Sequence, residues 1–70
     1  MPYVNIKITR EGATEPQKAE LIAGTTALLQ RVLGKNPHTT FVVIEEVELA
    51  DWGIGGLPVE QYRRQPEAKP

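Results

Sequence analysis

The feature that most constrains the fold is one long amphipathic segment between two apolar runs. Across residues 14–33, apolar side chains recur at the i, i+4, i+7 and i+8 spacing of a single helical stripe, with charged residues on the other sides. Thr14 and Gln17 have the pattern of a capping box, Gly34 supplies a left-handed C-cap, and Pro37 bars continuation. The pattern predicts one helix that begins at Thr14 or the next residue and ends before Gly34.

The two apolar runs predict strands. Residues 2–9 alternate apolar and polar side chains, as in a strand with one packed face. Residues 39–47 are apolar on both faces at their centre, which is typical of strands covered on both sides in parallel sheets. Because the predicted helix is long enough for a right-handed crossover, we expect two parallel neighbouring strands. The fold class is therefore α/β, with a β-α-β protomer.

The C-terminal third predicts a short hairpin and a tail. Residues 48–51 predict a turn, and the glycines of residues 52–56 predict a tight turn or hairpin. This glycine-rich stretch lacks the Lys-Ser/Thr ending and the following helix of a phosphate loop, so we exclude nucleotide binding. We expect a short strand over residues 59–62. Residues 1–64 form one predicted domain, and residues 65–70 a flexible tail without a large apolar anchor.

Length and composition favour self-association. A chain of 70 residues buries only roughly 60% of its unfolded surface, and small domains usually compensate with disulfides, a metal or oligomerisation. This chain has no Cys and one His, which leaves oligomerisation. The helix covers only one face of a two-stranded sheet, so we expect other copies of the chain to complete the sheet.

Charge and hydropathy limit the expected partners. The net charge of −1 gives no general attraction to nucleic acid or anionic lipid. No apolar run reaches the length of a membrane span, and the N-terminus lacks the pattern of a signal peptide. We expect a small neutral or acidic ligand, no nucleic acid, no membrane, and a cytoplasmic location, which the lack of Cys fits.

Pro2 is the main candidate for chemistry. Aminopeptidases remove an initiator Met before a small residue, and removal of Met1 converts the Pro2 nitrogen from an amide to a secondary amine on a rigid ring. A pocket walled by Trp52, Ile54 and similar groups lowers the pKa of this amine, because it penalises the protonated form, and neighbouring cations act in the same direction. A neutral amine is a competent general base or a carbonyl-attacking nucleophile.

Other polar residues have weaker claims to catalysis. Glu45 and Glu46 are adjacent in a predicted strand and point to opposite faces, which favours a solvated edge or an interface ion pair over a shared catalytic dyad. His38 has no second candidate ligand with which to hold a metal. Lys7 and Arg10 at a sheet edge are usually solvating charges.

Several segments together resemble the 4-oxalocrotonate tautomerase family. These segments are Met1–Ile8, Gln17-Lys18 with Leu21-Ile22, Val42–Glu46 and Trp52–Gly56. They occur in the family's order, and the resemblance covers residues 2 to about 64. The resemblance implies a β-α-β protomer, commonly a homohexamer built as a trimer of dimers, without metal or cofactor. It implies that Pro2 moves a proton between carbons of an enol or unsaturated keto acid, and that Trp52 and Ile54 line an apolar pocket wall.

The chain departs from the family at two positions. Ala13 and Phe41 stand where founding members have arginines that bind the substrate's carboxylates and polarise its carbonyl, so a dicarboxylic substrate is not implied. Arg10 is a candidate replacement for the first arginine, and Arg63 belongs to a basic pair that matches one near the family's C-terminus. Pro2 and Arg10 are roughly 26 Å apart along one strand. A site with both is therefore expected to be shared between subunits whose first strands pair antiparallel.

We therefore predict a cofactor-independent tautomerase of a small enolic or α-keto acid, with Pro2 as general base and then acid. The predicted substrate-binding residues are Arg10, Phe41, Trp52, Ile54 and Arg63. The aromatic Phe41 and Trp52 favour a substrate with an aromatic group. Two alternatives stay open. One is a hydratase, dehalogenase or decarboxylase on the same scaffold, which needs a protonated proline and polar groups for water; the other is a non-catalytic oligomeric interaction module.

Overall fold

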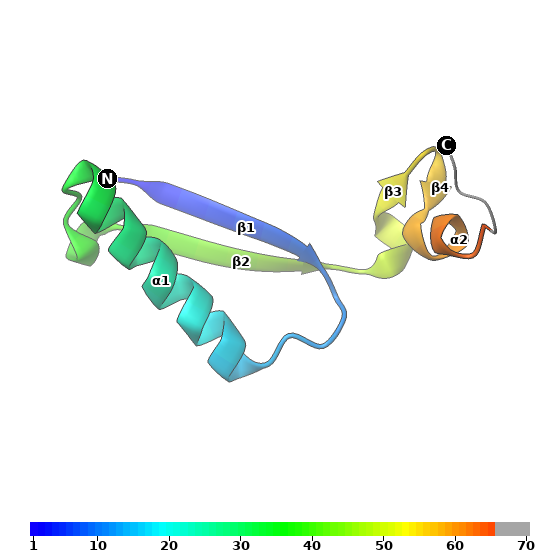
Figure 1. Cartoon of the computed structure of the whole chain (residues 1–70), viewed down its shortest axis with the longest axis horizontal. Helices are drawn as coiled ribbons and strands as arrows, with labels where there is room; N and C mark the ends of the chain where they lie inside the picture. The colour runs from blue at the N-terminus through cyan, green and yellow to red at the C-terminus, as the bar shows by residue number, and fades with distance from the viewer. Residues whose placement is uncertain (66–70) are drawn as a thin grey trace.

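A computed structural model describes residues 1–65 of the chain, and the rest of the predicted tail, residues 66–70, lies outside the described residues. The elements follow the order shown in Figure 1. They are β1 (Tyr3–Thr9), α1 (Glu15–Leu33), β2 (Phe41–Val47), β3 (Gly53–Ile54), β4 (Leu57–Pro58) and α2 (Val59–Arg63), with 3-10 turns at Pro37–Thr39 and Leu49–Asp51.

Helix α1 begins and ends where its capping residues predict. The Thr14 hydroxyl accepts a hydrogen bond from the Gln17 amide at 3.2 Å, and the Gln17 side chain accepts one from the Thr14 amide at 2.9 Å. Gly34 adopts φ 68° and its amide donates to the Gln30 carbonyl at 2.9 Å. These hydrogen bonds confirm both the capping box and the left-handed C-cap. Each provides partners for main-chain groups that have none within the helix.

The predicted parallel pairing is also confirmed. β1 and β2 run parallel, with Tyr3 opposite Phe41 and Thr9 opposite Val47. β2 begins two residues later than predicted, because Asn36 caps the 3-10 turn that occupies the predicted start of the strand. In that turn the Asn36 side chain accepts from the His38 amide at 2.9 Å.

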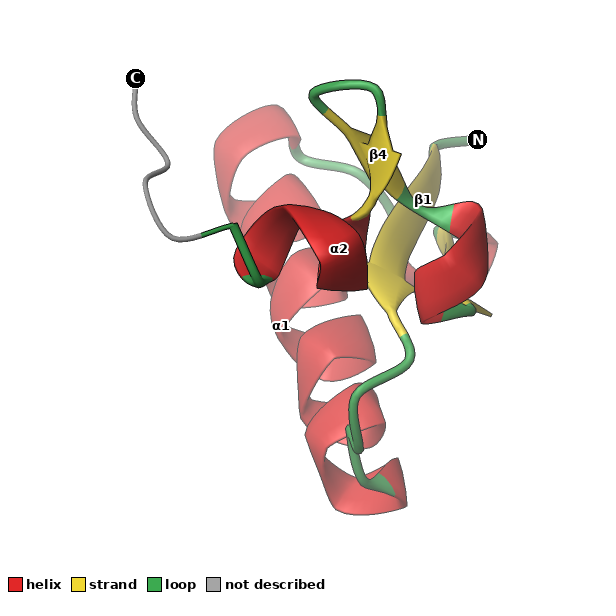
Figure 2. Cartoon of the chain, turned by 90° about the vertical axis from the view of Figure 1, so that its right-hand side faces the viewer, coloured by secondary structure: helices red, strands yellow, loops and turns green. Residues whose placement is uncertain are grey.

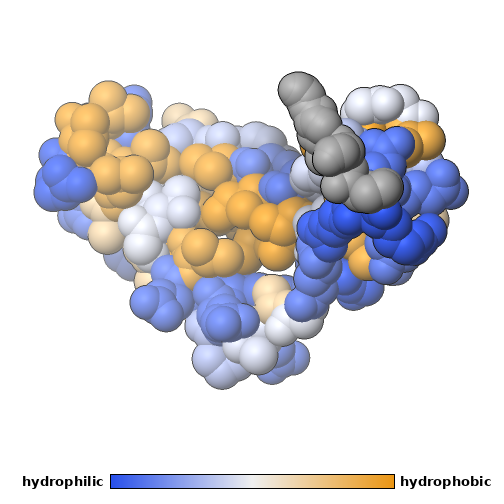
Figure 3. Space-filling view, turned by 45° about the vertical axis from the view of Figure 1, so that its right-hand side comes forward, coloured by the Kyte–Doolittle hydropathy of each residue, from blue (hydrophilic) through white to orange (hydrophobic). Residues whose placement is uncertain are grey.

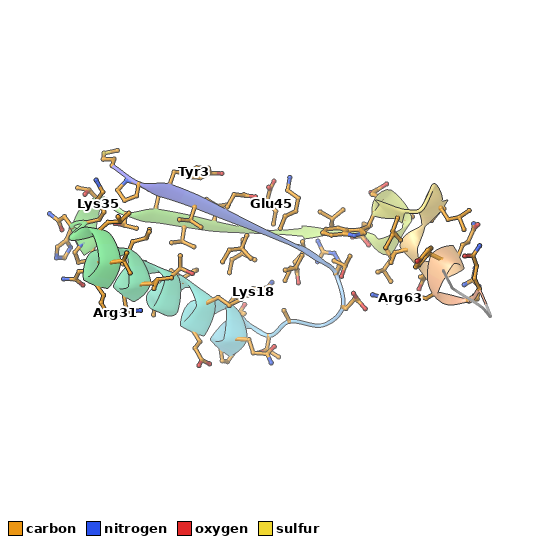
Figure 4. The ribbon with its side chains drawn as sticks, turned by 45° about the horizontal axis from the view of Figure 1, so that its top comes forward. Tyr3, Lys18, Arg31, Lys35, Glu45 and Arg63 are labelled. Carbon is orange, nitrogen blue, oxygen red and sulfur yellow. The ribbon has the colours of Figure 1, made fainter. Side chains whose placement is uncertain are left out.

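Helix α1 covers one face of this sheet (Figure 1). Side chains at even positions of both strands are half-buried toward the helix, whereas those at odd positions from Tyr3 to Lys7 and from Phe41 to Glu45 are exposed. Figure 4 shows Tyr3 and Glu45 on the side of the sheet away from α1. The second apolar face expected for β2 is therefore bare in a single chain.

The C-terminal segment confirms the predicted hairpin and corrects the strand expected after it. β3 pairs antiparallel with β4, but residues 59–62 lie in helix α2, which packs beside β4 (Figure 2). Val59 and Tyr62 are three residues apart, so they share a helical face but would lie on opposite faces of a strand. Val59 is buried, and its amide donates to the Trp52 carbonyl at 2.8 Å. The spacing of Val59 and the half-buried Tyr62 therefore fits a helix better than a strand.

A single protomer is elongated and nearly coreless. It extends 47 × 25 × 16 Å, with a radius of gyration of 16.1 Å, against about 11 Å for a compact domain of this length. Within residues 1–65, Val59 is the one buried hydrophobic residue, and broad hydrophobic areas lie on the surface (Figure 3). No helix of the described part is long and apolar enough to cross a membrane. The exposed apolar surface favours the predicted self-association.

Candidate active site

Pro2 stands immediately before β1, at the end of the sheet marked by the N-terminus in Figure 1. Its carbonyl accepts a hydrogen bond from the Phe41 amide at 3.0 Å, which extends the ladder by one residue beyond Tyr3. Because successive side chains alternate in a strand, the half-buried Pro2 ring shares the face of Val4 and α1. The Phe41 side chain, 52% exposed, lies on the opposite face.

Arg10 follows β1 at the other end of the sheet and is already ion-paired. Its amide donates to the Val47 carbonyl at 2.8 Å. Its guanidinium donates from Nε to Glu48 Oε2 at 2.7 Å and from Nη1 to Glu46 Oε1 at 2.9 Å. The Lys18 ammonium from α1 also donates to Glu46 Oε1, at 3.1 Å. Glu46 is therefore a largely buried ion-pair partner that holds Arg10 and α1 together.

Glu45 points to the other face of the sheet, as the adjacent-residue argument predicts. It accepts a hydrogen bond from the Asn5 side-chain amide at 3.0 Å and pairs with Lys7 at 3.4 Å. These contacts, the Asn5 hydrogen bond first and the Lys7 charge second, lower the pKa of Glu45. Glu45 and Glu46 thus have separate partners on separate faces, which confirms that they do not form a shared dyad, and their ion pairs lie within one chain.

Arg63 ties α2 to the loop after β1. Its Nη1 and Nη2 donate to the two carboxylate oxygens of Glu11 at 2.9 Å and 3.3 Å, and the Thr9 hydroxyl donates to the same carboxylate. The hydrogen bond from Arg63, with that from Thr9 second, lowers the pKa of Glu11, and the Glu11 carboxylate raises the pKa of Arg63. The charge of Arg63 is therefore compensated inside the chain.

Trp52 and Ile54 lie in the C-terminal hairpin region, far from Pro2. Trp52 is half-buried between the 3-10 turn and β3, and Ile54 is exposed on β3. The hairpin and the N-terminus mark opposite ends of the long axis in Figure 1. The apolar wall predicted around Pro2 is therefore not formed within one chain.

The predicted site residues fall into two groups. Pro2 and Phe41 lie at one end of the protomer, whereas Arg10 lies at the far end of β1, and Trp52, Ile54 and Arg63 belong to the C-terminal hairpin and α2 at the opposite end. One copy cannot bring the two groups together, so any site that uses both needs residues from different copies. The sequence reasoning missed the acidic partners of the two arginines, Glu11, Glu46 and Glu48. The β1–β2 register would have revealed Glu48, since it places residue 10 beside residue 48.

A shallow groove along α1 was also not predicted. It is lined by Ala13, Gln17, Leu21, Gly24 and Leu28 among others and contains none of the predicted site residues. Within residues 1–65, no group of three or more His, Cys, Asp or Glu side chains is placed to hold a metal ion.

Comparison with known proteins identifies the family. The sequence profile of the family described as "Tautomerase enzyme" matches residues 2–62. The curated "Probable tautomerase K2" of Dickeya dadantii is 58% identical over 65 residues, covering 93% of this chain and 97% of that protein.

Solved structures agree with this assignment. The crystal structure of DmpI from Helicobacter pylori superposes with a TM-score of 0.81 at 40% identity and covers 86% of this chain and 98% of that one. A heterohexamer 4-oxalocrotonate tautomerase from Chloroflexus aurantiacus superposes with a TM-score of 0.78 at 26% identity, over 87% of this chain and 97% of that one. With the β-α-β fold, the terminal hairpin and these similarities together, the chain belongs to the 4-oxalocrotonate tautomerase family, whose members are isomerases.

Proposed function

We propose that this tautomerase acts on a small enolic or α-keto acid, with the Pro2 amine as its catalytic group once Met1 is removed. The amine accepts a proton from one position of the substrate and returns it to another, while the electron pair moves through the intervening enolate. Pro2 therefore acts first as base and then as acid, and the pair of transfers leaves the enzyme unchanged.

The observation that carries this proposal is how Pro2 is held. Its carbonyl, not its nitrogen, joins the sheet by accepting from the Phe41 amide. The residue is held at the end of the β1–β2 hydrogen-bond ladder through its carbonyl, and its nitrogen takes no part in the strand pairing. Removal of Met1 therefore creates an amine at a fixed position without the loss of a sheet hydrogen bond.

The proposed site is shared between copies of the chain. β1 is an edge strand of the described two-stranded sheet, so a second β1 can pair with it antiparallel and bring Arg10 of that copy toward Pro2. Phe41, Trp52, Ile54 and Arg63 are proposed to complete the site from neighbouring copies. We propose a homohexamer built as a trimer of dimers, which works in the cytoplasm.

Two measurements test the proposal in order. Intact-mass analysis first establishes that Met1 is absent. Ketonisation of phenylenolpyruvate and of 2-hydroxymuconate by the processed oligomer is then compared with that by Pro2→Ala. Activity that Pro2→Ala loses supports the tautomerase, whereas a processed oligomer that converts none of a panel of enol acids would favour an interaction module.

A further inference from the structure

Both arginines proposed for substrate binding are neutralised by carboxylates of their own chain. Arg10 donates to Glu46 and Glu48, and Arg63 forms a two-point pair with Glu11. The two-point contact of Arg63 with Glu11 has the planar guanidinium–carboxylate geometry that fixes both partners in orientation. The charge that a substrate meets at these arginines is therefore set by the glutamates as well.

The charges around Arg10 cancel. Two cations, Arg10 and Lys18, face two carboxylates, Glu46 and Glu48, within the described residues. The Arg63 pair with Glu11 cancels in the same way. Neither cluster therefore carries a net positive charge. The two negative charges of a dicarboxylate ligand are not balanced by either cluster, and they lie close to the like charge of Glu48 or Glu11.

Arg10 nevertheless keeps hydrogen-bonding capacity. Its Nε and Nη1 groups donate to Glu48 and Glu46, and within residues 1–65 its Nη2 group donates to no protein acceptor. A guanidinium carries five N–H donors, so one edge is left for a carboxylate or carbonyl oxygen. Because the Arg10 cluster has little net charge, its free N–H donors are expected to bind a ligand with one carboxylate better than a ligand with two.

The remaining site residues are apolar. Phe41 is 52% exposed and Ile54 is 42% exposed, and both are uncovered in the single chain. Such surfaces gain free energy when they cover an apolar group and lose it when they desolvate a second carboxylate. The apolar surface and the cancelled charges therefore favour the same kind of substrate.

We propose that the enzyme selects enol acids with a single carboxylate and an apolar remainder, and that Glu48 and Glu11 are specificity-determining residues that disfavour dicarboxylates. This inference rests on the proposed function, because it places Arg10 and Arg63 at the substrate. Glu46 is left out as a test position, since its side chain is only 12% exposed and also holds Lys18.

The test compares kcat/KM for 2-hydroxymuconate, with two carboxylates, with that for phenylenolpyruvate, with one. The ratio is measured in the unaltered processed oligomer, in Glu48→Gln, in Glu11→Gln and in the double variant. Glu20→Gln is the matched control, because Glu20 lies on α1 and forms no ion pair within the described residues. Each substitution at Glu48 or Glu11 removes one negative charge and is expected to raise the ratio about fivefold.

The unaltered protein is expected to prefer phenylenolpyruvate, and the double variant to move the preference toward 2-hydroxymuconate. The inference is overturned if the double variant has the same ratio of kcat/KM values as Glu20→Gln. It is also overturned if the unaltered enzyme has a higher kcat/KM for the dicarboxylate than for phenylenolpyruvate. If the double variant fails to assemble, the inference is tested by the dependence of the unaltered enzyme's kcat/KM on salt concentration. Little change of kcat/KM for 2-hydroxymuconate with ionic strength supports cancelled charges, whereas a steep fall reveals an uncompensated cation and overturns it.

Pro2→Ala separates this inference from the proposed function. If Pro2→Ala keeps full activity on both substrates, the catalytic role of Pro2 is wrong. If Pro2→Ala is inactive and the ratio ignores Glu48 and Glu11, the catalytic role stands and the specificity role is wrong.

Discussion

Pro2 and Phe41 share a main-chain hydrogen bond of 3.0 Å, and their side chains leave opposite faces of the sheet. The Pro2 ring lies on the face that α1 covers, and Phe41 lies with Tyr3 on the bare face. Phe41 therefore cannot form a wall against the Pro2 ring of its own chain. For Phe41 to line a pocket, another copy must approach the bare face.

Mixed oligomers test whether the site is shared. Inactive Pro2→Ala and Arg10→Ala chains, unfolded together and reassembled, are expected to recover up to about a quarter of the unaltered activity. If each site takes Pro2 from one copy and Arg10 from another, random assembly of the two variants leaves both residues intact in about a quarter of the sites. The measurement is kcat/KM of the mixture, with each variant reassembled alone as control. Verified mixed oligomers without recovered activity would count against sharing.

Assembly is expected to supply most of the stability. The described chain has one buried hydrophobic residue and exposes Leu21, Leu28, Phe41 and Val43. Because association that favours the folded state follows mass action, the melting temperature is expected to fall by several degrees over a roughly hundredfold dilution. Calorimetry or circular dichroism at several protein concentrations measures this. A melting temperature independent of concentration would mean that the protomer is stable alone.

The hairpin is expected to depend on Gly55 more than on Gly56. Both glycines have positive φ, 61° and 84°, so alanine at either position should cost about 1–2 kcal/mol. At Gly55 an added Cβ also meets the Tyr62 ring at 3.0 Å, whereas at Gly56 it meets nothing within 4 Å. Urea unfolding should show a larger loss for Gly55→Ala.

A Tyr62→Ala background provides the control for the hairpin prediction. Without the tyrosine ring, Gly55→Ala should cost no more than Gly56→Ala. Equal losses for the two substitutions in the unaltered protein would show that the ring moves aside freely.

Glu11 and Glu45 are expected to contribute to acid lability. The pKa of each carboxyl in the folded protein lies below its ordinary value of 4.5, because of Arg63 and Thr9 at Glu11 and of Asn5 and Lys7 at Glu45. The unfolded chain therefore takes up these protons first as the pH falls. The stabilisation is present above the ordinary value and is lost as the pH falls through the lowered one.

The melting temperature between about pH 6 and pH 3 measures this effect. The double variant Glu11→Gln/Glu45→Gln should lose less stability across that range than the unaltered protein does. The difference is expected to be small, because both carboxylates are exposed and screened by solvent. An identical pH dependence of the two proteins would show that these contacts do not persist in solution.

The elements that the sequence predicted correctly are those specified by local signals. The Thr14–Gln17 capping box and Gly34 define α1 because their hydrogen bonds close within a few residues. The β1–β2 pairing followed from the length of the crossover. The error at residues 59–62 arose because a segment of five helical residues is too short for its periodicity to distinguish a helix from a strand.

The site was predicted less completely, for a physical reason. Pro2 was a candidate because its proposed chemistry needs only the removal of Met1, which the neighbouring residue type allows. The partners of Arg10 and Arg63 depend on strand register and on how the hairpin folds back toward the loop after β1. Residues 52 positions apart, such as Glu11 and Arg63, carry no local signal of their contact.

The most direct test of the central claim is the pKa of the Pro2 nitrogen, followed by nuclear magnetic resonance in protein labelled with ¹⁵N-proline and freed of Met1. A proline that acts as a base is expected to titrate below the usual range of an α-amino group, and the same ionisation should appear in the pH profile of kcat/KM. An amine that is still protonated at neutral pH would contradict the account and favour the hydratase or decarboxylase alternative, which needs that form.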